Sequence, residues 1–128
     1  MTLTRIAAAG AAVLALSTVA AWRIAAYAPQ ELDPLKVASN THKLLFENQF
    51  MRVIQAKVPA GSLEPKHSHP KGLTVYLADY DIEQKAFPDG KVTRAHRTFG
   101  TVSWSDAVVH EVRNTGKTNS HAVRIELK

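Results

Sequence analysis

The pattern of apolar and polar residues divides the chain into two parts that predict different structures. Residues 6–21 are apolar, rich in alanine and free of charge, and Arg23 is the one charged residue of the wider stretch 6–28. A helix formed by this stretch would be apolar on every side, which is typical of an export signal or a membrane anchor. Beyond residue 41 the pattern changes to short runs of β-branched and aromatic residues separated by turn residues.

The second part of the chain predicts strands and no helix. Residues 61–70 are expected to form a loop that leads into a strand, and residues 88–91 a hairpin turn. Many short strands at even spacing favour an all-β sandwich or barrel, and about 90 residues suit one jelly roll. The strands are expected at residues 42–47, 50–58, 73–80 with a continuation over 82–87, 92–99, 101–104, 108–113 and 121–127.

The domain organisation follows from these two parts. We expect a signal peptide or membrane anchor over residues 1–28, a polar linker over 29–41 and one β-barrel domain over 42–128. Cleavage at one of two small-x-small sites and an uncleaved anchor both stay open. Either outcome predicts export, to the periplasm or to the inner membrane, with membrane contact through residues 6–28 if the segment is retained.

Composition narrows the chemistry without naming a function. The chain has no cysteine, which excludes a disulfide framework, a thiolate nucleophile and a cysteine-ligated metal site. Its net charge of +5 is spread along the chain without a block of Lys and Arg. We therefore expect a solvated basic surface and no nucleic-acid partner.

Three of the six histidines have a spacing that suggests a common site. His67 and His69 are two residues apart, so on a strand their imidazoles point to the same face. His110 shares its parity with Val108 and Val112, so it is expected to face the barrel interior. Imidazoles that converge in this way suit a divalent metal.

The other three histidines have less specific expectations. His42 and His96 are expected at the surface. His121 shares the parity of Val123 and Ile125 on the last strand. Apolar alternation normally marks the inward face of a strand, so His121 is expected to point inward or to lie at the barrel rim.

The segment around the first two of these histidines resembles the first motif of the cupin family. In that family a glycine is followed by five residues and then by His-x-His, and here Gly61 precedes His67-x-His69 at that spacing. The family's glutamate follows a few residues later. This chain lacks it, because Leu73 and Thr74 occupy its positions.

A later segment resembles the family's second motif. Gly100 opens it and His110-x-x-x-Asn114 closes it, although the histidine comes one residue early and Asp106 and Val108 stand where the family has proline and glycine. The resemblance covers roughly residues 46–127. It implies a double-stranded β-helix, the jelly-roll barrel of cupins, behind an N-terminal hydrophobic helix.

The resemblance places His67, His69 and His110 on three of the family's four metal-ligand positions. Three imidazoles without a carboxylate suit Zn, Fe, Ni or Cu better than Mg or Mn. A barrel that has lost its metal, and whose histidines line a polar pocket, stays open as the alternative.

Several functions are compatible with such a barrel. The first is an exported protein that binds a small-molecule ligand through the metal, and the second is a metal-dependent dioxygenase or isomerase. A metal-free scaffold or ligand-binding barrel is the third. One-domain cupins often form dimers, so a homodimer is also expected. The residues expected to line the ligand pocket are Glu64, Tyr76, Trp104, Asn114 and His121.

Overall fold

The computed structural model describes residues 30–128, and the segment predicted as a signal peptide or membrane anchor lies outside them. Within the described part, no helix is long and apolar enough to cross a membrane. Its strands are β1 (His42–Glu47), β2 (Met51–Ala56), β3 (Leu63–His69), β4 (Gly72–Tyr76), β5 (Tyr80–Ala86), β6 (Val92–Arg97), β7 (Val102–Ser105), β8 (Val108–Asn114) and β9 (Ala122–Leu127).

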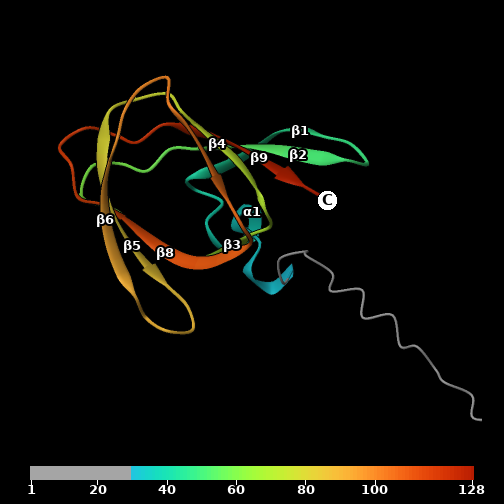
Figure 1. Ribbon diagram of the computed structural model, residues 1–128, viewed down its shortest axis with the longest axis horizontal. Coiled ribbons are helices and arrows are strands. Elements are labelled where there is room, and N and C mark those ends of the chain that lie inside the picture. Colours follow the sequence, from blue (N-terminus) through green and yellow to red (C-terminus); the bar gives the residue numbers. More distant parts are fainter. Residues whose placement is uncertain (1–29) are drawn as a thin grey trace, which may run out of the picture.

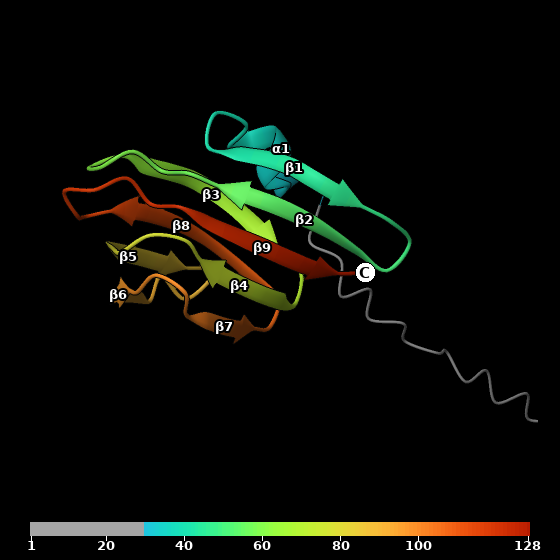
Figure 2. The same cartoon turned by 90° about the horizontal axis from the view of Figure 1, so that it is seen from above.

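These strands form two antiparallel sheets (Figure 1). One sheet has five strands in the order β1-β2-β9-β4-β7, and the other has four in the order β3-β8-β5-β6. Seen from above in Figure 2, the two sheets lie side by side, with β3, β8, β5 and β6 to the left and the five-stranded sheet to the right. The all-β prediction is confirmed.

Strand β3 is where the sequence prediction was wrong. A loop was expected over residues 61–70, but β3 runs from Leu63 to His69 and pairs with β8. Its sequence is polar, so it lacks the apolar alternation of a half-buried strand. Backbone hydrogen bonds to β8 hold it in the sheet instead. Its register shifts between Glu64 and His67, around Pro65, which has no N–H to donate.

The stretch predicted as a linker, residues 29–41, contains two short helices, η1 (Gln30–Leu32) and α1 (Pro34–Val37). Asp33 caps α1, because its carboxylate accepts a hydrogen bond from the Leu35 amide at 3.0 Å, and Pro34 begins the helix where no donor is needed. Helix α1 packs against β1 and β3, so this part of the stretch lies against the barrel.

Strand β9 presents its charged side chains to the barrel interior. Ala122, Arg124 and Glu126 are buried, whereas Val123 and Ile125 are partly exposed. The sequence predicted the opposite, since apolar residues normally take the inward face. The interior is therefore mixed, with a polar part and a small apolar cluster of Tyr76, Tyr80, Ile82, Val112 and Ala122.

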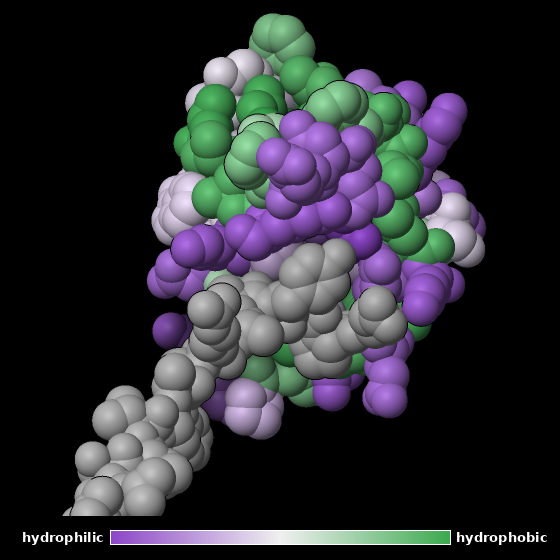
Figure 3. All heavy atoms as spheres, turned by 90° about the vertical axis from the view of Figure 1, so that its right-hand side faces the viewer, coloured by the Kyte–Doolittle hydropathy of each residue, from purple (hydrophilic) through white to green (hydrophobic). Residues whose placement is uncertain are grey.

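The outward apolar residues of β9 belong to a row that crosses the five-stranded sheet. The strand register sets Phe46, Val53, Ile125, Leu73 and Trp104 opposite one another. Figure 3 shows that apolar residues, in green, reach the surface beside a band of hydrophilic side chains. These five residues are therefore cross-strand neighbours in the sheet.

Candidate functional site

Four imidazoles meet inside the barrel. His67 and His69 come from β3, His110 lies opposite His67 on β8, and His42 is the first residue of β1. The ring centroids of His67 lie 4.9 Å from those of His69, 4.6 Å from His110 and 5.2 Å from His42. The structure thus brings the three histidines of the predicted site together.

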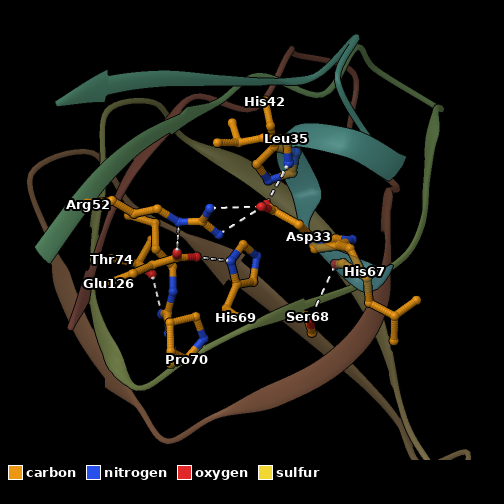
Figure 4. Close-up of polar contacts among 12 residues, drawn as sticks. Asp33, Leu35, His42, Arg52, His67, Ser68, His69, Pro70, Thr74 and Glu126 are labelled. Carbon is orange, nitrogen blue, oxygen red and sulfur yellow. Dashed lines mark hydrogen bonds and ion pairs between the residues drawn. The ribbon is translucent and has the colours of Figure 1, made fainter. Parts of the chain in front are cut away.

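His42 is the histidine that the sequence prediction placed wrongly. It was expected at the surface, but only 6% of it is exposed. Its ring lies beside His67 and His69 in Figure 4, and one ligand nitrogen from each of the three lies within 4.8 Å of the others. The other side chains of β1 are exposed, so no alternation along that strand could have indicated its burial.

The proton positions of His67 and His69 are fixed by their neighbours. His67 Nδ1 lies 2.7 Å from the Pro65 carbonyl oxygen, and His69 Nδ1 lies 2.6 Å from Glu126 Oε1. A carbonyl or carboxylate oxygen only accepts, so each Nδ1 carries the proton and donates it. Nε2 of both rings is left as the nitrogen with a free lone pair.

Glu126 is the centre of a buried ion network (Figure 4). Besides His69, its carboxylate accepts a hydrogen bond from Arg52 Nε at 2.5 Å. The same guanidinium donates twice to Asp33, at 3.0 and 3.1 Å. The capping residue of α1 is thereby linked through Arg52 and Glu126 to the histidine cluster.

Burial keeps the histidines neutral. It lowers the pKa of His42 to about 4 and that of His110 to about 2. Charge repulsion from His67 is the second cause that lowers the pKa of both residues. Burial lowers the pKa of His67 and His69 as well. Neutral imidazoles have the free lone pair that a metal or a hydrogen-bond donor needs.

Thr74, one of the two residues that the resemblance placed at the cupin glutamate position, lies on the cavity wall. Thr74 points inward, and its hydroxyl accepts a hydrogen bond from Arg124 Nη1 at 3.0 Å. The carboxylate of this site instead comes from Glu126 on β9. It reaches His69 at Nδ1, which is the position of a residue that orients a metal-binding histidine from behind.

A cavity of about 330 Å³ adjoins the four histidines. This volume is at the lower end of the range for small-molecule pockets. Four of the five residues predicted for the ligand pocket contribute to its wall. They are Glu64, Tyr76, Trp104 and Asn114.

These four residues are not equally available to a ligand. Asn114 is fully buried, and its amide donates to the carbonyls of Val58 and Thr118, so it holds a turn. Trp104 borders the cavity but is 54% exposed, in the outer row. Glu64 is buried, which raises its pKa to about 7, and its Oε1 lies 3.3 Å from His42 Nδ1.

His121, the fifth predicted pocket residue, does not line this cavity. It precedes β9, is partly exposed, and its Nε2 lies 3.0 Å from Gln55 Nε2. The prediction placed His121 on the same face of β9 as Val123 and Ile125, and that face points outward. His96 is exposed, as predicted, and pairs with Asp81 at 2.8 Å.

No sequence pattern predicted that five further residues lie at the site. Charged and amide side chains that alternate along a strand are normally on a solvated face, and no local signal distinguishes the buried ones. The five residues are His42, Arg52, Gln84, Arg124 and Glu126.

Comparisons with known proteins agree with this architecture. No family model matches the chain, and no curated protein matches its sequence. Solved structures do match it. A cupin domain from Bordetella pertussis Tohama I has 22% identity and a TM-score of 0.62, over 68% of this chain and 91% of that one.

Two further solved structures are similar to this chain. A protein with a double-stranded β-helix domain from Klebsiella pneumoniae has 19% identity and a TM-score of 0.54, over 67% of this chain and 74% of that one. An RmlC-like cupin protein from Methanocaldococcus jannaschii has 12% identity and a TM-score of 0.54, over 68% and 80%. The barrel of this protein therefore has the double-stranded β-helix fold of cupin-domain proteins.

Proposed function

We propose that this barrel binds one divalent transition metal through His67 and His69, with His42 or His110 as a third ligand, beside a cavity for a small organic molecule. Zn, Fe, Ni and Cu are the candidates, because imidazole suits them. The observation that carries the proposal is the fixed Nδ1–H of His67 and His69. It leaves Nε2 of both buried, neutral rings unprotonated.

The spacing of the nitrogens supports the same proposal. A metal with bonds of about 2.0–2.1 Å to two imidazoles holds the nitrogens roughly 3.0–3.4 Å apart, depending on the bond angle. His67 Nε2 and His110 Nε2 are 3.0 Å apart. The acceptor behind His69 is a carboxylate, the group that raises the basicity of a metal-binding imidazole. A bound metal would supply Lewis acidity and open coordination positions at the cavity.

A metal-free histidine network is the second candidate, and one observation favours it. Gln84 Nε2 lies 3.4 Å from His110 Nδ1, and His110 Nε2 lies 3.0 Å from His67 Nε2. If the Gln84 amide donates to Nδ1, His110 carries its proton on Nε2 and donates it to His67. The ring nitrogens of His110 and His67 then all have hydrogen-bond partners without any metal. In that case the barrel would bind its ligand through hydrogen bonds alone.

Elemental analysis of the untagged full chain distinguishes the two candidates. We expect about one metal per chain in the wild type, and none in the His67→Ala/His69→Ala double variant. His96→Ala is the matched control, because His96 is an exposed histidine, and it should keep its metal. Absence of metal from the wild type after incubation with Zn²⁺, Ni²⁺ or Fe²⁺ would overturn the first candidate and leave the second.

Single variants identify the third ligand. His42→Ala and His110→Ala are compared in the same assay, and we expect the loss of one of them to weaken metal binding much more than the loss of the other. Retention of metal at full affinity in both would contradict a three-histidine site.

We also propose that the protein is exported, since residues 6–28 are apolar and carry Arg23 as their one charge. Fractionation of cells that produce the tagged protein tests this. A tag that is recovered in the soluble cytosolic fraction at full mass would contradict it.

A further inference from the structure

Two arginines on the cavity wall have no carboxylate partner among residues 31–128. Arg124 is only 7% exposed, and its two terminal nitrogens donate to neutral oxygens, at 3.0 Å to the Thr74 hydroxyl and at 2.6 Å to the Pro70 carbonyl. Arg97 lines the same cavity, and its guanidinium carbon lies 4.9 Å from the ring centroid of Tyr76. Both positive charges therefore lack a counter-charge in contact.

Two other arginines of the described part are paired. Arg52 contacts both Asp33 and Glu126, and Arg94, which lies on β6 with Arg97, contacts Glu83 at 2.7 Å. Proteins rarely bury a cation without a bonded anion, because the lost hydration is not replaced. The missing partner of the cavity arginines is therefore expected to come from outside the described chain.

Unpartnered hydrogen-bond donors are found at the same place. Arg97 Nε, Arg124 Nε and Ser105 Oγ are buried without a hydrogen-bond partner in the described part of the protein. All three side chains line the cavity. Buried donors without partners are uncommon in folded proteins and call for an explanation. The carboxyl oxygen Glu64 Oε1 lines the same cavity and also lacks a hydrogen-bond partner in the described part. Three unpartnered donors around one cavity, two of them on arginines, favour a ligand that accepts hydrogen bonds and carries negative charge.

Part of the cavity wall is apolar. The cluster of Tyr76, Tyr80, Ile82, Val112 and Ala122 lines it. An inorganic anion would leave that surface without a partner. An organic acid would place an apolar body against it and its charge against the arginines.

We propose that the cavity binds a small organic acid. Its carboxylate is held by Arg124, Arg97 and Ser105, and its apolar part lies against the apolar cluster that contains Tyr76 and Ile82. This inference rests on the proposed function in that the cavity is a ligand site, but it does not require the metal. Guanidinium and carboxylate match in geometry as well as in charge.

The test is a titration of the full chain, freed of metal with a chelator, with three probes. Benzoate is the organic acid, benzamide is its uncharged counterpart of similar shape, and inorganic phosphate is the anion without an apolar body. Calorimetry measures binding. The change in tryptophan fluorescence reports it independently, because Trp104, one of the two tryptophans of the chain, borders the cavity. We expect saturable benzoate binding, at least tenfold weaker benzamide binding and no phosphate binding.

Two variants connect binding to the arginines. Arg97→Met should weaken benzoate binding by about tenfold or more, the effect of losing one charged hydrogen-bond partner. Arg94→Met is the matched control on the same strand, where the side chain is exposed and faces Glu83, and it should bind as the wild type does. Arg124→Lys keeps the buried charge and removes the planar donors, and it should weaken binding by a similar factor.

Several results would overturn the inference. They are equal affinity for benzoate and benzamide, unchanged benzoate binding by both Arg97→Met and Arg124→Lys, binding of phosphate more tightly than benzoate, or no binding of benzoate.

The metal content of each protein sample is measured separately. Wild-type protein that binds metal but binds benzoate neither with the metal nor without it would defeat this inference and leave the metal site standing. Acid binding that requires the metal and ignores both arginines would place the carboxylate on the metal and defeat it as well.

Discussion

Replacing Glu126 by glutamine tests whether the buried ion network stabilises the barrel. The carboxylate accepts hydrogen bonds from both Arg52 and His69, whereas a glutamine has one acceptor oxygen and one donor nitrogen. One of the two donors would therefore lose its acceptor and face an amide N–H instead.

The expected magnitude follows from these contacts. A hydrogen bond to a charged group contributes about 1.5–3 kcal/mol, and a buried donor without an acceptor adds about 1–3 kcal/mol. We expect the Glu126→Gln variant to lose about 3 kcal/mol or more of its free energy of unfolding. Domains are typically stable by about 5–15 kcal/mol, so this loss is a large share of the total.

The assay is urea unfolding of the full chain, followed by circular dichroism. Glu47→Gln is the matched control, because Glu47 contacts Lys128 at 2.7 Å on the partly exposed surface, and such pairs contribute less than about 1 kcal/mol. If the two variants lose the same free energy, the reasoning is wrong. A second measurement addresses the site, since loss of the oriented His69 should weaken metal binding by about 10–100-fold.

The remaining predictions concern pH and packing. Burial raises the pKa of Glu64 to about 7 from 4.5, so its contribution to stability is present below about pH 4.5 and is lost as pH rises through 7. The wild type loses this contribution as pH rises, whereas a Glu64→Gln variant has no carboxyl group to ionise. The free energy of unfolding of the variant should therefore rise relative to wild type by about 2–3 kcal/mol between pH 5 and pH 9, measured by urea unfolding. A difference between the two proteins that does not change with pH would contradict this. The pKa of His42 falls to about 4 from 6.5, so its contribution is full above pH 6.5 and is lost toward pH 4. At pH 5 the metal-free protein should lose about 2 kcal/mol through this residue, and a His42→Gln variant that shows the same acid-induced loss as wild type would refute it. Gly72→Ala should lower the free energy of unfolding by about 3 kcal/mol, because the added Cβ would lie 2.0 Å from the Ile125 carbonyl oxygen. Thermal unfolding measures this, and an unchanged melting temperature would show that β4 and β9 can separate freely. Asn114→Ala should cost about 2–3 kcal/mol through two lost bonds to backbone carbonyls, and a loss below about 0.5 kcal/mol would show that the turn does not depend on the amide.

The sequence predicted the fold well and the composition of the interior poorly. Apolar and β-branched runs located strands such as β4 and β8, and the spacing of His67, His69 and His110 matched a known motif. Alternation along β9 showed which residues share a face, but it does not say which face is inside. The inward face was the charged one, Arg124 and Glu126, because the interior is built around an ion network.

Contacts between segments that are far apart in the chain could not be predicted from the sequence either. Asp33 reaches Arg52 from a stretch that had the composition of a linker, and His42 is buried at the start of a strand whose other side chains are exposed. Such positions depend on where a helix of four residues packs in three dimensions. Polar residues carry no periodic signal that would indicate it.

The polar interior has a consequence for how this protein responds to temperature. Among residues 31–128, eleven buried side chains are polar or charged and eight are hydrophobic, besides Pro34 and Pro70. Exposure of apolar surface on unfolding raises the heat capacity, whereas exposure of polar surface lowers it. The barrel therefore has a smaller heat-capacity change on unfolding than a barrel of the same length whose interior side chains are apolar. Its stability curve is flatter, and its stability varies less between cold and warm conditions.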